Sequence, residues 1–199
     1  MCVLLISNSG RPLLQHCSAE QLDFLRSIRS LGYITAARLD DENERFRLAA
    51  AALSDFGIAA EHLRLGDDFK LRLKRVDAVL VSGGNTYALL KRLRHANALS
   101  LLADRVRGGL PYIGTSAGTN IAGPNILATN DWNVVGCNQF DAMGLVPWAI
   151  NPHYMQQDPN MAPGSETRDQ RIGEYIAVNR APLLAIEEQT AVRVEDRHA

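Results

Sequence analysis

The sequence is poor in cysteine and in net charge, and each shortage excludes a class of protein. Its three cysteines, Cys2, Cys17 and Cys137, are scattered and include no CxxC pair. This odd number argues against a disulfide framework or a zinc ribbon and favours a reducing compartment. Lys and Arg number 21 against 22 Asp and Glu, so no bulk charge is available to hold nucleic acid or an anionic membrane. A local charged pocket is still compatible with that balance.

Long hydrophobic runs are also missing. The longest, such as residues 48–53, are far short of the roughly 20 apolar residues that a membrane helix needs. Residues 1–6 are apolar, but no basic region precedes them and no small-residue cleavage site follows. We interpret them as a strand rather than a signal peptide. The sequence therefore predicts a cytoplasmic protein with no membrane partner.

The chain does contain a regular alternation of short apolar runs with longer amphipathic ones. Its 199 residues fit one domain or at most two small ones, and we find no repeat, low-complexity tract or linker. Residues 1–199 are therefore predicted to form a single domain. Residues 78–82 (AVLVS) are apolar without alternation, which indicates a strand buried on both faces of a parallel sheet. The alternation predicts an α/β fold with a mostly parallel sheet.

The expected elements follow from apolar periodicity and from capping residues. Apolar runs predict strands at 3–7, 33–39, 61–65, 78–82, 110–113 and 183–186. Helical spacing predicts helices at 21–31, 41–56, 86–95, 99–107 and 166–178. Beyond Pro124 the alternation weakens, and residues 125–163 contain one clear apolar run, at 143–150.

Residues 114–118 (GTSAG) carry the strongest catalytic signal. They form G-x-S-x-G after a predicted buried strand and before a small-residue helix start, which is the context of a nucleophile elbow. Such a turn exposes the serine Oγ at the carboxyl end of the sheet, and the helix start offers N–H groups to a developing oxyanion. The motif indicates that Ser116 is a nucleophile. The alternative is a glycine-rich turn with an incidental serine.

A serine nucleophile requires a base, and His153 is the best placed of the five histidines. It follows the apolar run at 145–150, so we expect it at the carboxyl end of a strand, where α/β sheets hold ligands. A lone histidine after a strand is more often structural, but its combination with Ser116 favours a base. The other histidines lie among charged residues, before a helix or beside the C-terminus: His16, His62, His95 and His198.

The sequence leaves open which carboxylate would orient His153. Asp131 lies between the serine and the histidine in the chain, whereas Glu187 and Glu188 follow the late apolar run. The order Ser–Asp–His is that of α/β-hydrolases. However, only 37 residues separate Ser116 from His153, too few for the βα units that normally intervene. A different α/β scaffold is implied.

A second glycine turn, at residues 83–86 (GGNT), follows the strand at 78–82. It lacks the Walker lysine and the G-x-G-x-x-G spacing, which disfavours phosphate binding. We expect this turn to bring a backbone N–H toward Ser116 and to complete an oxyanion hole with the N–H of Ala117. The alternative is a tight turn with an Asn or Thr helix cap.

Assembled in order, these motifs resemble the peptidase E family, the α-aspartyl dipeptidases. The resemblance covers about residues 3–190. Its matching elements are 7–9 (SNS), 83–86 (GGNT), 112–118 (YIGTSAG), 129–131 (TND), 140–142 (FDA), 150–153 (INPH) and 166–171 (ETRDQR). It implies a three-layer α/β/α fold similar to class I glutamine amidotransferases, with a serine in place of their cysteine. It also implies a serine exopeptidase that cleaves dipeptides with an N-terminal aspartate and needs no metal or other cofactor.

The resemblance also implies roles for the catalytic residues. Ser116 matches the nucleophile and His153 the general base. Asp131 matches the aspartate usually assigned to the triad, and Glu188 matches a glutamate proposed as the orienting carboxylate in some relatives, so the third member stays open. The backbone donors of the oxyanion hole are matched by Gly84 and Ala117.

For substrate recognition, the resemblance points first to Arg168, which matches an arginine linked to the aspartate side chain. An arginine can clamp a carboxylate through two parallel hydrogen bonds. Arg171 is the local alternative, and Asn8 and Ser9, in the turn after the first strand, are further candidates. The expected partner is a small Asp-X dipeptide. The sequence leaves the oligomeric state open, with a homodimer as the candidate assembly.

The sequence departs from the family in three places, the first of which is the region between Tyr33 and Asp41, which is less like the family than the rest. The loop at 154–163 differs in sequence and length, and the chain ends at Ala199 where relatives continue into a further strand, so the C-terminus is expected to be short or trimmed.

Two alternative functions stay open. A cyanophycinase-like peptidase acting on aspartyl polymers is the nearer alternative, but no long insertion surrounds the site. A catalytically silent binding or regulatory protein on the same scaffold is the other. A missing nucleophile or base would favour it, and both are present.

Overall fold

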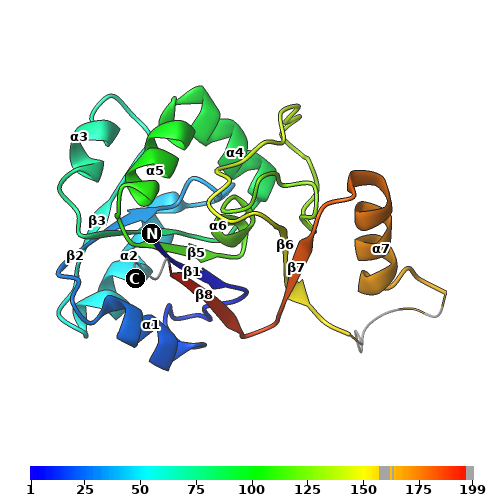
Figure 1. Cartoon of the computed structure of the whole chain (residues 1–199). Helices are drawn as coiled ribbons and strands as arrows, with labels where there is room; N and C mark the ends of the chain where they lie inside the picture. The colour runs from blue at the N-terminus through cyan, green and yellow to red at the C-terminus, as the bar shows by residue number, and fades with distance from the viewer. Residues whose placement is uncertain (157–161, 163, 196–199) are drawn as a thin grey trace.

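A six-stranded sheet forms the centre of the molecule (Figure 1). The computed structural model describes residues 1–156, 162 and 164–195. The strand order is β3-β2-β4-β5-β1-β8, with five parallel strands and β8 antiparallel at the edge, beside β1. The strands of this sheet are β1 (Cys2–Ile6), β2 (Ser30–Ile34), β3 (Ala59–His62), β4 (Ala78–Val81), β5 (Tyr112–Thr115) and β8 (Ala191–Glu195).

Helices cover both faces of this sheet and give the three layers that were predicted. On one face lie α1 (Ser18–Leu25) and α2 (Glu42–Ser54). On the other lie α3 (Phe69–Leu73), α4 (Thr86–His95), α5 (Ala98–Arg107) and α6 (Ala117–Asn120). In the part of the chain that the structure describes, no helix is long and apolar enough to cross a membrane.

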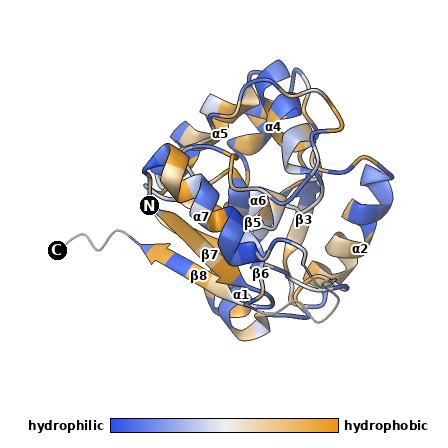
Figure 2. Ribbon diagram, turned by 90° about the vertical axis from the view of Figure 1, so that its right-hand side faces the viewer, coloured by the Kyte–Doolittle hydropathy of each residue, from blue (hydrophilic) through white to orange (hydrophobic). Residues whose placement is uncertain are grey.

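A second, smaller sheet stands beside the main one. It consists of two parallel strands, β6 (Ala149–Tyr154) and β7 (Leu183–Glu187). The helix between them, α7 (Arg168–Asn179), lies on the outer side of this pair, away from the main sheet (Figures 1 and 2). Tyr175 of α7 packs against Ala149 and Ala128 in a small apolar cluster of their own.

Alternate residues of the central strands pack into two separate hydrophobic cores. Val79 and Val81 of β4 pack toward α4 and α5, whereas Ala78 and Leu80 pack toward α1 and α2. All four side chains are 0% exposed. Because both faces of the strand are covered, every position is apolar, and this explains the uninterrupted run that predicted a parallel sheet.

Each strand and helix predicted in the first half of the chain has a counterpart in the structure, but several boundaries were wrong. The strand expected at 33–39 begins at Ser30 and ends at Ile34. The helix expected at 21–31 ends at Leu25. Ile28 and Leu31 have helical spacing but enter the core from a turn and from β2, so burial alone produced the helical pattern. Two further elements, α3 and β8, were not predicted from the sequence and have only five residues each.

The G-x-S-x-G turn is packed backbone against backbone between three strands. A Cβ atom on Gly118 would lie 2.1 Å from the carbonyl oxygen of Val81, and one on Gly114 would lie 2.6 Å from the carbonyl oxygen of Gly118. The hydroxyl of Thr119 accepts the N–H of Ile6 at 3.1 Å and lies 2.7 Å from the carbonyl oxygens of Ile6 and Gly114. Both glycines are therefore required by close approach, as the motif predicts.

Gly118→Ala should therefore lower the free energy of unfolding by about 1–3 kcal/mol, because the new methyl group forces β4 and the turn apart. Gly173→Ala is the matched control. It lies inside α7, and an added Cβ would meet no described atom within 4 Å. This change should raise the free energy of unfolding by about 0.5–1 kcal/mol. Urea denaturation of both variants checks the prediction, and equal stabilities would contradict it.

Candidate active site

Ser116 sits at the carboxyl end of β5, immediately before α6. Its backbone has φ 52° and ψ −107°, a conformation that non-glycine residues rarely adopt. The N–H of Ser116 donates to the carbonyl oxygen of Ile6 at 3.0 Å, which ties the turn to β1. The local structure is the sharp strand-to-helix turn that the motif predicts.

His153 reaches Ser116 from the second sheet. Its Nε2 atom lies 2.9 Å from Ser116 Oγ. It lies within β6, at an irregularity in the pairing with β7, and has φ 59°. Its N–H donates to the hydroxyl of Ser7 at 2.8 Å, which fixes the bulge against the end of β1. The strand-like run expected at 145–150 becomes a strand only from Ala149, so the histidine is held inside the strand rather than after it.

Glu188 is the carboxylate that the structure brings to His153. It follows β7 directly, and its Oε2 atom lies 2.5 Å from His153 Nδ1. Asn8 Nδ2 donates to the other carboxylate oxygen at 2.5 Å, and the hydroxyl of Ser7 donates at 3.4 Å. Partial burial raises the pKa of Glu188, but the hydrogen bonds from Asn8, His153 and Ser7 and the charge of His153 outweigh it, so the net pKa lies below the usual value.

Asp131 lies elsewhere, at the start of α4. Its carboxylate accepts the N–H of Thr86 at 2.7 Å and lies 3.3 Å from the hydroxyl of Thr129. Among the described residues it makes no hydrogen bond or ion pair with His153. A carboxylate at a helix N-terminus interacts favourably with the helix dipole. Of the three candidate carboxylates Asp131, Glu187 and Glu188, Glu188 is therefore the one that contacts His153 among the described residues.

The second glycine turn lies directly against Ser116, as expected. A Cβ atom on Gly83 would be 3.0 Å from that of Ser116. Gly84 has φ 147°, and a Cβ atom there would be 2.4 Å from the carbonyl oxygen of Ala37. Ala117 is the first residue of α6, where a backbone N–H has no acceptor within the helix. The second glycine turn and the start of α6 thus both lie beside the serine.

A cavity of about 320 Å³ opens over Ser116 and His153, which is large enough for a small molecule. Its wall includes three arginines that the sequence analysis did not single out: Arg11, Arg38 and Arg45. A signal for Arg45 was available. It lies one and two turns before Ala49 and Leu53, on the helical stripe that faces the sheet.

Arg168 and Arg171 lie at the start of α7 and line other cavities. The guanidinium of Arg168 donates to the side-chain oxygen of Asn130, whose amide in turn donates to the carbonyl oxygen of Pro152 at 2.9 Å. Arg168 is thereby linked to the backbone beside His153. Arg171 lies 3.5 Å from the carboxylate of Glu166.

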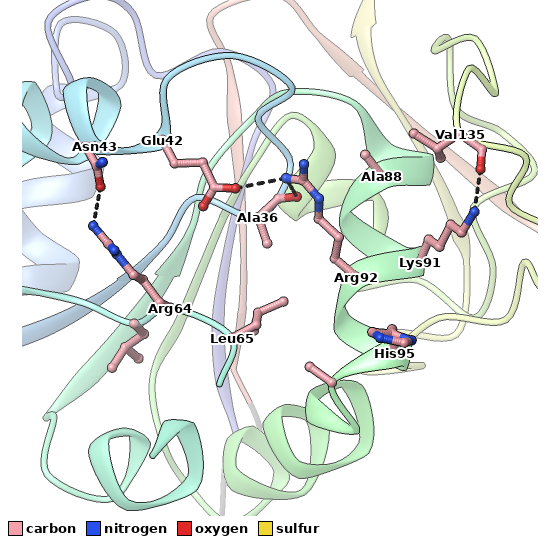
Figure 3. A pocket seen from close by; sticks show the side chains of 12 residues that line it. Ala36, Glu42, Asn43, Arg64, Leu65, Ala88, Lys91, Arg92, His95 and Val135 are labelled. Atoms are coloured by element: carbon pink, nitrogen blue, oxygen red, sulfur yellow. Dashed lines mark hydrogen bonds and ion pairs between the residues drawn. The ribbon is translucent and has the colours of Figure 1, made fainter. Parts of the chain in front are cut away.

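A larger cavity, of about 850 Å³, lies between α2, β3 and α4 and lacks the residues described above (Figure 3). Its floor is mostly apolar, and its cations are already engaged. Arg64 is bonded to Asn43, Arg92 to Glu42, and Lys91 to the carbonyl oxygen of Val135. Because its cations are already bound, we interpret this cavity as structural. Among the described residues, no group of three or more His, Cys, Asp or Glu side chains could hold a metal ion.

A serine, a histidine and a carboxylate joined in this order, on a strand-to-helix turn of an α/β sheet, are the arrangement of a serine hydrolase. Residues 3–199 match the model of Peptidase family S51. The chain therefore belongs to that family, in agreement with the resemblance drawn from its motifs.

Relatives of known sequence support the same assignment. The chain is 40% identical to a Streptomyces coelicolor protein named "Peptidase E", over 100% of this chain and 83% of that protein. It is 35% identical to a Drosophila melanogaster protein named "Probable alpha-aspartyl dipeptidase", over 99% and 84% of the two chains. A crystal structure of a peptidase from an acI-B1 Actinobacterium has the same fold, with a TM-score of 0.73 and 14% identity over 98% of this chain and 83% of that one.

Proposed function

We propose that this protein is a serine dipeptidase that releases N-terminal aspartate from Asp-X dipeptides. The observation that carries the proposal is the hydrogen-bonded chain from Ser116 through His153 to Glu188. Membership of Peptidase family S51 supports peptide hydrolysis, and the name of the Drosophila relative supports aspartyl dipeptides as substrates. The free thiols of all three cysteines support action in the cytoplasm.

In this proposal, His153 Nε2 takes the proton of Ser116 Oγ as the oxygen attacks the scissile carbonyl carbon. The N–H groups of Gly84 and Ala117 stabilise the oxyanion of the tetrahedral intermediate. His153 then gives the proton to the leaving amine, and the aspartyl group stays on Ser116 as an ester. A water molecule, deprotonated by His153, hydrolyses that ester. Glu188 holds the Nδ1–H of His153 and stabilises the imidazolium during both steps.

Asp131 has a positioning role in this mechanism rather than a place in the hydrogen-bonded chain. By accepting the N–H of Thr86, it fixes the turn that carries Gly84. Asn120, which follows the serine turn, lies 3.3 Å from the hydroxyl of Thr86 and 3.4 Å from that of Thr129. We therefore treat Asp131 as a positioning residue for the oxyanion donor.

Arg168 is proposed to bind the side chain of the substrate aspartate. The capping box of Thr167 and Gln170 fixes the start of α7, and the hydroxyl of Tyr154 donates to Asp169 at 2.8 Å. These contacts hold the first turn of α7 beside the strand that carries His153. A fixed guanidinium offsets the loss of hydration that the aspartate carboxylate suffers on entering a pocket.

The first experiment incubates the protein with Asp-Leu, Leu-Asp and Asn-Leu and measures the released amino acids. Asp-Leu should be cleaved and the other two should not, because only Asp-Leu presents the aspartate side chain beside the scissile bond. Ser116→Ala should lose activity by several orders of magnitude while its urea midpoint stays unchanged. Asp-Leu cleavage within about tenfold of the original rate would contradict the assignment of the nucleophile.

Glu188→Gln and Asp131→Asn should separate the two carboxylates. Loss of the charge at Glu188 should lower kcat for Asp-Leu by roughly 10³–10⁴-fold, since the amide no longer stabilises the imidazolium. Asp131→Asn keeps an acceptor for the N–H of Thr86, so its loss should be much smaller. Steady-state kinetics of both variants provide the measurement. The reverse order of effects would return Asp131 to the triad.

Arg168→Met should lower kcat/KM for Asp-Leu by at least about 100-fold, because a carboxylate left unpaired in a pocket costs about 3 kcal/mol or more. The preference for Asp-Leu over Asn-Leu should fall with it. Arg171→Met is the matched control on the same helix, with its partner Glu166 in solvent, and it should change neither rate. Loss of activity in the Arg171 variant alone would show that the wrong arginine was assigned.

A further inference from the structure

The cavity over Ser116 and His153 has a basic wall that the proposed catalytic steps do not use. Arg11, Arg38 and Arg45 line it, and no acidic side chain does so among the described residues. A dipeptide carries a C-terminal carboxylate in addition to the aspartate side chain. None of the roles assigned so far provides a cation for that terminal group.

The acidic residues on the far side of these arginines already have partners. Asp40, Asp41 and Glu44 line a neighbouring cavity together with the same three arginines. Asp40 is paired with Arg38 through both of its carboxylate oxygens. The carboxylate of Asp41 accepts two backbone N–H groups and caps α2, and Glu44 is paired with Arg47 at 2.7 Å. The charge of Arg38 is therefore balanced locally.

Arg45 differs from Arg38, because none of the ion pairs among the described residues includes it. It lies in the first turn of α2, on the same stripe as Ala49 and Leu53, which are 2% and 0% exposed. Its Nε atom is buried and has no hydrogen-bond partner in the part of the chain that the structure describes. Its guanidinium also interacts with the hydroxyl of the buried Tyr33, but that group is neutral and does not balance the charge. A buried donor without an acceptor is costly, and a cation near a helix N-terminus is opposed by the helix dipole. A bound carboxylate would relieve both costs.

We propose that Arg45, with Arg11 beside it, binds the C-terminal carboxylate of the dipeptide. This inference rests on the proposed dipeptidase function. His153 must protonate the leaving amine, so the second residue of the substrate lies in the cavity that His153 and Arg45 share. Arg168 is on α7, and α2 and α7 lie well apart in both views (Figures 1 and 2). The two carboxylates of the substrate are thus bound by arginines from two different helices.

This arrangement accounts for a restriction to dipeptides. In a longer peptide, the position of the terminal carboxylate is taken by a neutral amide, and the charge of Arg45 then has no anionic partner from the substrate. A site built for a charged group rejects a substrate that lacks the charge. Arg45 thereby selects dipeptides over longer peptides by the charge of the terminal carboxylate.

The test compares Asp-Leu with Asp-Leu amide, which differ only in the terminal carboxylate. Arg45→Met should lower kcat/KM for Asp-Leu by roughly 10- to 100-fold, the loss expected for a hydrogen-bonded charge pair. The same variant should cleave Asp-Leu amide at a rate within about twofold of the original protein. Arg45→Lys should restore part of the activity toward Asp-Leu. Arg45→Gln repeats the comparison if the methionine variant does not fold.

Arg47→Met is the matched control, since Arg47 lies on the same helix, is 67% exposed and is paired with Glu44. It should leave both rates unchanged. Equal losses on both substrates in the Arg45 variants, or no loss on either, would overturn the inference. Arg168→Met, by contrast, should lower both rates because both substrates carry the aspartate side chain. If the original protein cleaves neither substrate, the dipeptidase proposal itself fails, and the role of Arg45 fails with it.

Discussion

Ile6 and Ser7, at the carboxyl end of β1, hold together the two parts of the candidate site. The carbonyl oxygen of Ile6 accepts the N–H of Ser116, which fixes the nucleophile turn on the main sheet. The hydroxyl of Ser7 accepts the N–H of His153 and lies 3.4 Å from Glu188, both of which come from the smaller sheet. Two sheets that share no strand pairing among the described residues thus meet at the fully buried Ser7, and the hydrogen bond from Asn8 to Glu188 adds a second link. The 2.9 Å contact between Ser116 and His153 depends on this junction.

Much of the main sheet could be predicted from the sequence, because its signals are local. The run at 78–82 is apolar because both faces are covered, and the glycines at 114 and 118 are required by backbone contact. The third member of the hydrogen-bonded chain could not be predicted in this way. Glu188 lies beside His153 only because β6 and β7 pair in parallel, with Tyr154 opposite Glu187. Strand pairing across an intervening helix leaves no local pattern in the sequence.

Two of the carboxylates that the sequence left as alternatives, Glu188 and Asp131, occupy different electrostatic settings. Glu188 accepts hydrogen bonds from Asn8 and His153 and has a lowered pKa, which keeps it charged beside the imidazole. Asp131 accepts a backbone N–H at a helix start. Each is satisfied where it stands, so neither is needed for the other's role. A motif match placed both residues near the site, but only hydrogen-bond geometry separates a group that contacts the base from one that supports the neighbouring turn.

The basic wall of the cavity likewise combines a local sequence pattern with a tertiary arrangement that the sequence does not show. On α2, the spacing of Arg45, Ala49 and Leu53 already places the arginine on the buried stripe. What the spacing does not reveal is that α2 begins at the carboxyl edge of the sheet, beside the glycine turns and the serine. A charged residue at a core-facing position conflicts with the local pattern, and such conflicts concentrate at functional sites. In the proposed complex, the terminal carboxylate of the substrate balances the charge of Arg45, so that binding depends on the charge of the substrate.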